Sequence, residues 1–183
     1  MTKIAIVGNI ASGKSCVEKI LIEKGYTVYD TDIIAHEALD KSDIIKSMFP
    51  NAVANGKINR KILANIVFKD NEKKKLLESV LHPQVIDFIK QLTESPVFVS
   101  VPQLFEANME PLFDKVIFIS APKKIRLERL MKRNNLTKEE AELRINAQLD
   151  ENEKIKKSDF VIINNSTTDK LKENVENILT NIC

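Results

Sequence analysis

Short runs of consecutive hydrophobic residues alternate along the chain with longer segments that have a helical repeat of hydrophobic and polar positions. Four of these runs are rich in β-branched or aromatic residues, namely 4–7, 97–101, 116–119 and 160–163. Such near-continuous hydrophobicity is typical of parallel strands that helices cover on both faces. A fifth, weaker strand is predicted over residues 26–29. A mainly helical protein, the alternative architecture, would leave these runs unexplained.

The segments between the runs predict helices. Residues 72–93 have a helical pattern but include Pro83, which predicts a break or kink near that residue. Another helix is predicted from Thr137 to about Ile155, because Thr137 and Glu140 have the spacing of a capping box. Strands that alternate with helices indicate an α/β protein built around a five-stranded parallel sheet flanked by helices.

The strongest local signal is a glycine-containing loop between the first predicted strand and the first predicted helix. Its sequence, Gly8-Asn9-Ile10-Ala11-Ser12-Gly13-Lys14-Ser15, matches G-x-x-x-x-G-K-[ST] without a gap. Glycine permits backbone dihedrals that let main-chain N–H groups turn toward phosphate oxygens. We expect Lys14 to reach the β- and γ-phosphates of a nucleotide and the Ser15 hydroxyl to bind Mg²⁺. The alternative is a turn that merely starts a helix. The position of the motif directly between a predicted strand and a predicted helix disfavours that interpretation.

The loop does not by itself name the reaction, because switch GTPases, transport ATPases and small-molecule kinases share it. The chain lacks the N-K-x-D segment that reads guanine in switch GTPases. Many ATPases end a later strand in an aspartate that helps to hold Mg²⁺, whereas the run from Val97 continues here into Pro102–Glu106. These absences favour a kinase of the nucleoside-monophosphate type.

With two aspartates after the second strand, the sequence resembles the dephospho-coenzyme A kinase family over nearly its whole length. The matching segments, in the family's order and spacing, are the phosphate loop, Asp30–Ala35, Gly56–Arg60, Leu81–Pro83, Val101–Glu106, Arg144–Gln148 and Asn164–Asn165. The resemblance implies a three-layer P-loop kinase fold with a parallel five-stranded sheet, a helical lid and a helical acceptor-binding insert. It also implies one domain, 1–183, with a core at 1–30, 95–121 and 158–183, an acceptor-binding region at 31–94 and a lid at 122–157.

The resemblance assigns the general base of a kinase reaction to Asp32. A carboxylate there can orient a ribose hydroxyl and accept its proton. The alternative is that Asp32 only caps the helix that follows. Asp30 is expected to support the site.

Arginines of the predicted lid are candidates for stabilising the charge that develops during phosphoryl transfer. Arg126, Arg129 and Arg133 recur at helical spacing, and Arg144 follows in the next predicted helix. The family pattern favours Arg133 and Arg144 as catalytic residues together with Lys14. The alternative is that most of these arginines are surface charges paired with nearby glutamates.

The resemblance further implies two sets of binding residues. ATP would be bound by Gly8, Ala11, Ser12, Gly13, Lys14, Ser15, Cys16 and, beside the adenine, Asn165. The acceptor pocket would include Asp32, His82, Pro83, Pro102, Phe105 and Glu106. Some alternatives stay open, since His82 can be structural, Phe105 can be a core residue and Cys16 can be a small buried residue behind the loop.

The composition of the chain limits the kinds of partner that it is expected to bind. The chain has 28 basic and 26 acidic residues and a net charge of +2, which gives no support for a nucleic-acid or membrane binder. Its two cysteines, Cys16 and Cys183, are too few and too far apart to suggest a disulfide framework. We expect a cytoplasmic enzyme without an obligate protein partner, using ATP and Mg²⁺ to phosphorylate the 3′-hydroxyl of dephospho-coenzyme A. A nucleoside or nucleotide kinase and a non-catalytic nucleotide sensor are the alternatives.

Overall fold

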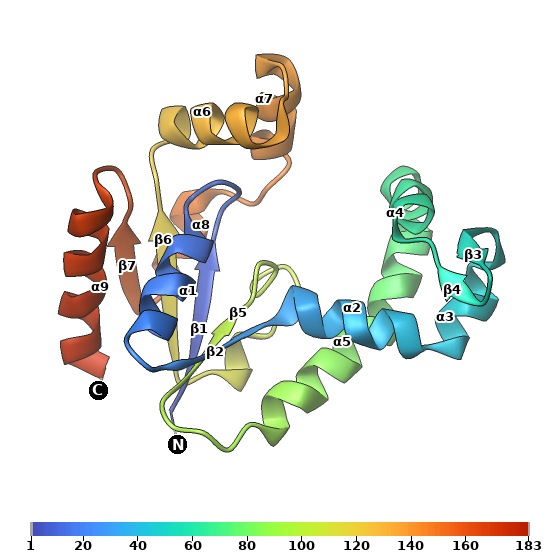
Figure 1. Ribbon diagram of the computed structural model, residues 1–183, viewed down its shortest axis with the longest axis horizontal. Coiled ribbons are helices and arrows are strands. Elements are labelled where there is room, and N and C mark those ends of the chain that lie inside the picture. Colours follow the sequence, from blue (N-terminus) through green and yellow to red (C-terminus); the bar gives the residue numbers. More distant parts are fainter. Residues whose placement is uncertain (1, 183) are drawn as a thin grey trace. The chain divides into compact units, whose positions relative to one another are not determined.

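A computed structural model describes residues 2–182, and the contacts within it divide the chain into two compact units (Figure 1). The first unit comprises the residues up to Asp30 together with those from Thr93 onward, and the second is Thr31–Leu92. The assignment of one domain with core, acceptor and lid subregions stays a prediction.

The first unit is built on a parallel sheet with the strand order β2-β5-β1-β6-β7. The strands are β1 Lys3–Gly8, β2 Thr27–Asp30, β5 Val97–Ser100, β6 Lys115–Ser120 and β7 Phe160–Ile163. All five predicted strands are confirmed, and the mainly helical alternative is wrong. The strand with the weakest signal, β2, lies at an edge of the sheet and is only partly buried, whereas β5 is buried along its whole length.

Two helices cover one face of this sheet. The helices α1 Lys14–Glu23 and α9 Thr168–Ile182 share a hydrophobic core with strands β1, β5, β6 and β7 (Figure 1). Ile4, Ile6 and Phe98 are completely buried in this core. The core thereby fixes the position of the loop that connects β1 to α1.

Three further helices follow β6, namely α6 Lys123–Asn134, α7 Lys138–Asn146 and α8 Glu151–Lys156, while a 3₁₀ turn, η2 Glu110–Leu112, precedes it. The predicted capping box is confirmed, because the side chains of Thr137 and Glu140 each accept a hydrogen bond from the other's backbone N–H. The prediction of one helix reaching Ile155 is wrong. The chain leaves the helical path after Asn146, and the Asp150 side chain caps a separate helix, α8.

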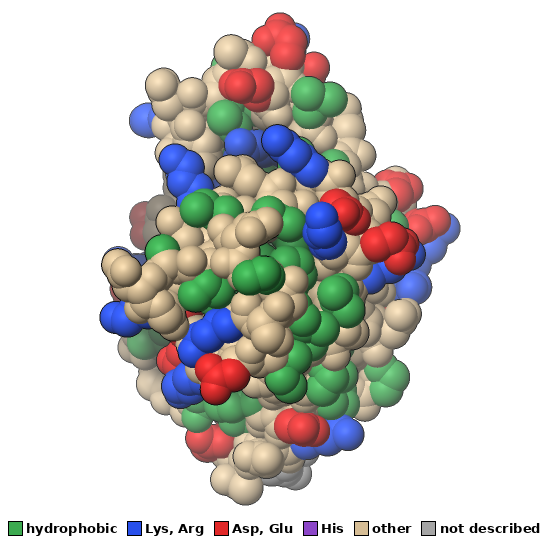
Figure 2. All heavy atoms as spheres, turned by 90° about the vertical axis from the view of Figure 1, so that its right-hand side faces the viewer, with side chains coloured by type: hydrophobic (Ala, Val, Ile, Leu, Met, Phe, Trp, Pro, Cys, Tyr) green, Lys and Arg blue, Asp and Glu red, His purple; other side chains and the backbone are tan. Residues whose placement is uncertain are grey.

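The second unit is helical apart from one short hairpin. Its elements are α2 Thr31–Lys41, α3 Asp43–Met48, η1 Pro50–Ala52, β3 Val53–Ala54, β4 Lys57–Ile58, α4 Arg60–Lys69 and α5 Asn71–Gln91. It has a core of its own, formed around Leu39, Ile45, Phe49 and Leu63. Figure 2 shows hydrophobic side chains interspersed with charged ones at the protein surface, and in this unit the large exposed ones are Ile33, Ile44, Ile62, Phe68 and Leu76.

Helix α5 continues through Pro83, so the predicted break is wrong, whereas the alternative of a kink stays a prediction. Proline removes one backbone donor from a helix and crowds the preceding turn. Here the Gln84 side-chain amide donates a hydrogen bond to the Val80 carbonyl at 3.0 Å, which satisfies an acceptor in that turn. Val85 and Ile89, on the following turns, are buried and anchor the second half of the helix.

Within residues 2–182, no helix combines the length and the apolar composition that crossing a lipid bilayer requires.

Candidate active site

The phosphate loop joins β1 to α1 and depends on both of its glycines. Gly13 has φ +94°, and a Cβ added to it would lie 2.0 Å from Nδ2 of Asn164. A Cβ on Gly8 would lie 2.5 Å from Oγ of Ser12 and 3.0 Å from the Ile119 carbonyl oxygen. The distances of 2.0 and 2.5 Å are shorter than real Cβ contacts, and 3.0 Å to a backbone oxygen is tight, so the loop path favours glycine at these two positions.

Two other residues of this region, Ala11 and Cys16, were predicted to bind ATP. Ala11 adopts a positive φ of 60°, which a side chain tolerates only at an energetic cost. Cys16 is a free, exposed thiol, so its interpretation as a small buried residue is wrong. Cys183 lies outside the described residues.

The loop fits an anionic ligand. The 10-residue helix α1 begins directly after the loop and has no acidic residue in its first turn, so its positive dipole end is uncompensated by carboxylates. Among residues 2–182, Oδ1 of Asn9 and Oγ of Ser12 are buried without a hydrogen-bond partner. Buried polar atoms of this kind usually find a partner, here available from a ligand or its water.

Lys14 has two partners at the base of the loop. Its Nζ donates to Oε1 of Glu18 at 2.8 Å and also to Oγ of Ser100. Ser100 ends β5, which pairs directly with β1. The ammonium group is thus held between the sheet and α1, beside the loop amides.

Side chains from the part of the chain after β6 bond main-chain atoms of the loop. Arg129 Nη1 donates to the Ser12 carbonyl at 3.3 Å, and its Nη2 donates to Oδ1 and the carbonyl of Asn164 at 3.4 Å. Asn164 Nδ2 donates to the same Ser12 carbonyl at 2.7 Å. On the other side of the loop, the Ile10 N–H donates to Oε1 of Gln148 at 2.8 Å. Three segments far apart in sequence therefore brace the loop.

The two lid arginines that were predicted to be catalytic, Arg133 and Arg144, are exposed rather than bound to the loop. Arg133 donates to Oδ1 of its neighbour Asn134 at 2.9 Å, and Arg144 is also exposed. Asn165, predicted beside the adenine, is exposed too, next to buried Asn164. Their roles stay predictions, whereas Arg129 contacts the loop directly.

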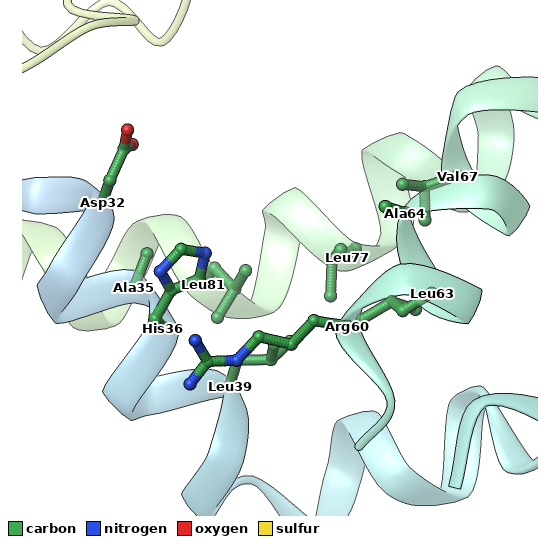
Figure 3. Close-up of a pocket in the computed structure, with 10 residues that line it drawn as sticks. All are labelled: Asp32, Ala35, His36, Leu39, Arg60, Leu63, Ala64, Val67, Leu77 and Leu81. Atoms are coloured by element: carbon green, nitrogen blue, oxygen red, sulfur yellow. The ribbon is translucent and has the colours of Figure 1, made fainter. Parts of the chain in front are cut away.

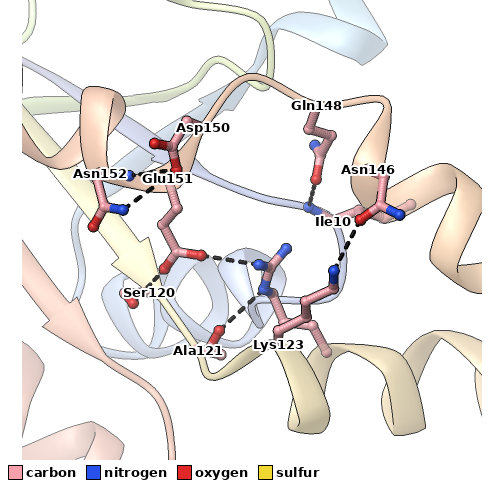
Figure 4. A network of polar contacts seen from close by, with 10 residues as sticks. Ile10, Ser120, Ala121, Lys123, Asn146, Gln148, Asp150, Glu151 and Asn152 are labelled. Atoms are coloured by element: carbon pink, nitrogen blue, oxygen red, sulfur yellow. Dashed lines mark hydrogen bonds and ion pairs between the residues drawn. The ribbon is translucent and has the colours of Figure 1, made fainter.

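Arg126 belongs to a group of polar contacts at the start of α8 (Figure 4). Its guanidinium donates to Oε2 of Glu151 at 2.9 Å and to the Ala121 carbonyl at 3.0 Å, and Ser120 donates to the other Glu151 oxygen. Lys123 bonds Oδ1 of Asn146 at 2.9 Å in the same region. Arg126 does not pair with a glutamate near it in sequence, as the alternative expected. It pairs with Glu151 of α8, which lies 25 residues later in the chain.

The segment after β5 contains three residues predicted for acceptor binding. Phe105 is buried, Pro102 is half-buried, and the exposed Glu106 accepts a hydrogen bond from Lys154 at 2.7 Å. The Lys154 side chain is only 1% exposed, so this carboxylate neutralises a buried cation. Lys157 lies with its Nζ 5.8 Å from the centroid of the Phe105 ring.

The second unit contains a pocket of about 230 Å³ (Figure 3). Asp32, His36 and Arg60 are its polar lining residues, and the rest of the wall is apolar: Ala35, Leu39, Leu63, Ala64, Val67, Leu77 and Leu81. Arg60 extends along the pocket so that its guanidinium lies toward His36. The pocket therefore combines an apolar surface with one carboxylate, one imidazole and one guanidinium.

Asp32 is the second residue of α2, inside the first turn, so its interpretation as the residue that caps the helix is wrong. Arg60 also bonds Asp40, and this hydrogen bond lowers the pKa of the Asp40 carboxyl below its ordinary value. His82 is half-buried and Pro83 exposed in α5, and neither lines this pocket, although Leu81 does.

Sequence reasoning missed His36, Glu18 and Arg60 at these sites, and it named Arg129 as a candidate without favouring it. Spacing offered a signal for the first two. His36 lies four residues after Asp32, and Glu18 four residues after Lys14, so each pair shares a helix face. Nothing local distinguishes Arg129 from the other lid arginines. Arg60 belongs to a matching segment, but only the tertiary fold brings it to the pocket.

The sheet order, the glycine loop and the helices that follow β6 are together the features of small-molecule kinases of the P-loop class. A shikimate kinase from Acinetobacter baumannii, with a TM-score of 0.61 at 17% identity over 100% of this chain and 93% of that one, has the same fold. Within this class of kinases, the chain belongs to the dephospho-CoA kinase family, whose sequence profile matches residues 2–170.

Relatives of the chain agree with this assignment. The dephospho-CoA kinase of Fusobacterium nucleatum is 41% identical over 182 residues, covering 94% of each chain. A Thermus thermophilus crystal structure has a TM-score of 0.87 at 36% identity, covering 100% of this chain and 98% of that one. The dephospho-CoA kinase structure from Campylobacter jejuni has a TM-score of 0.73 at 32% identity, covering 98% and 96% respectively. The predicted family, fold class and kinase activity are confirmed.

Proposed function

We propose that the protein transfers the γ-phosphoryl group of Mg·ATP to the ribose 3′-hydroxyl of dephospho-CoA and releases CoA and ADP. One observation carries the assignment of the reacting groups: Asp32 lines the pocket of the second unit and follows, by two residues, a strand of the sheet that bears the phosphate loop. The proposal includes action in the cytoplasm on a small-molecule acceptor, without nucleic acid, membrane or obligate protein partner. The near-balanced net charge of +2 supports that part.

The donor side of the reaction is assigned to the loop. Its N–H groups and the start of α1 would bind the phosphates, Lys14 would neutralise the β- and γ-phosphates, and Ser15 would hold Mg²⁺. Bound Mg²⁺ would supply positive charge to the transferring phosphoryl group. An exposed position at the start of α1 leaves the Ser15 hydroxyl accessible for this role.

Chain geometry supports Asp32 as the general base. Asp30 pairs in register with Ser100, which pairs with Ile6 of β1. Because neighbouring strands are about 4.8 Å apart, the end of β2 lies roughly 10 Å from the strand that leads into the loop. Asp32 follows that end of β2 by two residues, and α/β proteins bind ligands beyond the carboxyl ends of such strands.

In the proposed reaction the Asp32 carboxylate accepts the proton of the 3′-hydroxyl as its oxygen bonds to the γ-phosphorus. The bond between that phosphorus and the bridging oxygen breaks, and ADP leaves with the electron pair. Arg133 and Arg144 would stabilise the charge on the transferring group when the acceptor is bound. The apolar wall beside His36 and Arg60 suits an acceptor that carries both a base and phosphates.

An acceptor panel tests the proposal. Purified protein is incubated with Mg·ATP and either dephospho-CoA, a nucleoside, a nucleoside monophosphate or shikimate, and ADP release is followed by a coupled assay. We expect ADP release to exceed the acceptor-free rate only when dephospho-CoA is the acceptor. ³¹P NMR of the product should then identify a 3′-phosphate. Turnover with a nucleoside monophosphate instead would support the nucleotide-kinase alternative. Tight ATP binding without turnover of any acceptor would support a sensor.

The role of Asp32 is tested by Asp32→Asn. Removing a positioned base lowers turnover by roughly 100-fold or more, and ATP affinity should be unchanged because the loop is intact. Asp43→Asn is a matched control, since Asp43 also lies in the first turn of a helix in the second unit. Loss of folding and of ATP binding together in Asp32→Asn would contradict a catalytic role.

A further inference from the structure

The sheet lacks an acidic side chain at a position where many P-loop proteins have one. In those proteins the strand beside the loop strand ends in an aspartate that helps to hold Mg²⁺. Here that strand is β5, which pairs with β1 and ends at Ser100. A serine hydroxyl carries no negative charge, so the position cannot supply the carboxylate.

A carboxylate reaches the same place from α1 instead. Lys14 Nζ contacts both Oγ of Ser100 and Oε1 of Glu18, so the Glu18 carboxylate and the end of β5 are neighbours through one ammonium group. Glu18 lies three residues after Ser15 and four after Lys14, and this spacing makes it a neighbour of each of them on the helix surface.

The Glu18 pair differs from an ordinary surface ion pair. Its side chains, Lys14 and Glu18, are 18% and 15% exposed, with 2.8 Å between Nζ and Oε1. The pair Lys19–Glu23, at the same spacing on the same helix, is 77% and 49% exposed and has a separation of 3.8 Å. Glu18 is therefore held in a largely enclosed position at the phosphate loop, where solvent screens its charge poorly.

A fixed carboxylate at this point has opposite effects on two ligands. It repels a polyphosphate and competes with the phosphates for Lys14, but it attracts a cation that accompanies the polyphosphate. The loop requires both Lys14 and a cation for phosphoryl transfer. A residue that disfavours bare nucleotide and favours the metal complex would make the site selective for that complex.

We propose that Glu18 is a positioning residue for the nucleotide-bound Mg²⁺, and that it replaces the strand-end aspartate that this chain lacks. The inference rests on the proposed function, because it concerns the same nucleotide site. On nucleotide binding, Lys14 exchanges Glu18 for the phosphates, and the released carboxylate faces the cation that Ser15 would hold. In the nucleotide-free protein the same carboxylate keeps Lys14 beside the loop.

The test compares ATP binding with Mg²⁺ and with EDTA by isothermal titration calorimetry, without any acceptor. In the unmodified protein we expect Mg²⁺ to tighten ATP binding. In Glu18→Gln this tightening should fall about tenfold, the size of one hydrogen bond to a charged group, while binding of metal-free ATP should become stronger. Glu23→Gln, on the same helix, should behave as the unmodified protein.

A rescue experiment separates metal positioning from a structural role. Adding Ser100→Asp to Glu18→Gln returns a carboxylate to the end of β5 and should restore the tightening by Mg²⁺, whereas Ser100→Asn should not. Circular dichroism checks folding, and Glu18→Asp, which retains the charge, replaces Glu18→Gln if that variant does not fold. With this shorter side chain we expect a smaller loss than the tenfold.

Equal strengthening of ATP binding with and without Mg²⁺ in Glu18→Gln would overturn the proposal, because Glu18 would then be only a competitor for Lys14. A tenfold loss that Ser100→Asp does not restore would overturn the equivalence with a strand-end aspartate. In Glu18→Asp, a loss of the tightening by Mg²⁺ as large as the tenfold expected of Glu18→Gln would also count against the proposal. Since no acceptor is present, these outcomes differ from failure of the proposed function, which would appear as absent ADP release with dephospho-CoA.

Discussion

Gly13→Ala tests the loop geometry by a pair of matched substitutions. Gly13 and Gly25 both have positive φ, +94° and +88°, but an added Cβ has no atom within 4 Å at Gly25 and lies 2.0 Å from Nδ2 of Asn164 at Gly13. The two sites therefore share the backbone penalty of a non-glycine residue and differ in the steric conflict. The difference between the variants measures what that conflict costs.

The magnitudes follow from the contacts. A left-handed residue other than glycine costs about 1–2 kcal/mol, which is the whole effect expected of Gly25→Ala. In Gly13→Ala the Asn164 amide must also leave the buried Ser12 carbonyl, to which it donates at 2.7 Å. An unmade buried hydrogen bond adds about 1–3 kcal/mol, for a total near 2–5 kcal/mol.

Urea unfolding of both variants, without nucleotide, measures these free energies. We expect Gly13→Ala to be the less stable variant by about 1–3 kcal/mol, with the same dependence on urea. Equal loss of stability in the two variants would refute the reasoning, because the Asn164 contact would then contribute nothing to holding the loop.

Three further predictions concern other sites. Glu106→Gln leaves Lys154 buried without its carboxylate and should lower the free energy of unfolding by about 3–5 kcal/mol, measured in urea. Arg60→Gln removes the hydrogen bond that lowers the Asp40 pKa, so the pKa should rise toward its ordinary value in a carboxyl NMR titration. The stability linked to this shift is present above the unfolded pKa and is lost as pH falls through the lower folded value. Alkylation of exposed Cys16, followed by peptide mass mapping, should slow when Mg·ATP occupies the adjacent loop.

Each of these measurements has a control. Glu110→Gln removes the partner of Lys157, which is 58% exposed and 3.8 Å away, and should cost less than about 1 kcal/mol. A loss as small in Glu106→Gln would contradict a buried charge pair. An Asp40 pKa that stays low in Arg60→Gln would point to another cause. For Cys16, Mg²⁺ without nucleotide is the control, and an unchanged alkylation rate at saturating ATP would argue against a ligand beside the thiol.

Local sequence determined the parts of this protein whose cause is local. The strands β1, β5 and β6 are buried along most or all of their length and require continuous hydrophobic residues, so their signal is strong. The path of the phosphate loop likewise favours glycine at positions 8 and 13. The capping box at Thr137 was predictable for the same reason, since its two hydrogen bonds join residues three apart.

Tertiary structure decided what depends on partners distant in sequence. Pro83 did not end α5, because buried Val85 and Ile89 anchor the part of the helix that follows it. Arg129 and Asn164 meet at the Ser12 carbonyl only because β1, β6 and β7 are neighbours in the sheet.

The sequence by itself determined the phosphate loop, which depends on residue types at short, fixed spacings. Through its resemblance to a known family it also gave the class of the protein and Asp32 as a candidate base. Only the tertiary structure decided which arginine reaches the loop, which residues line the pocket and which carboxylate lies beside Lys14. These contacts depend on distances in space between elements. The order of the strands in the sheet sets those distances, and the order of the elements in the chain does not.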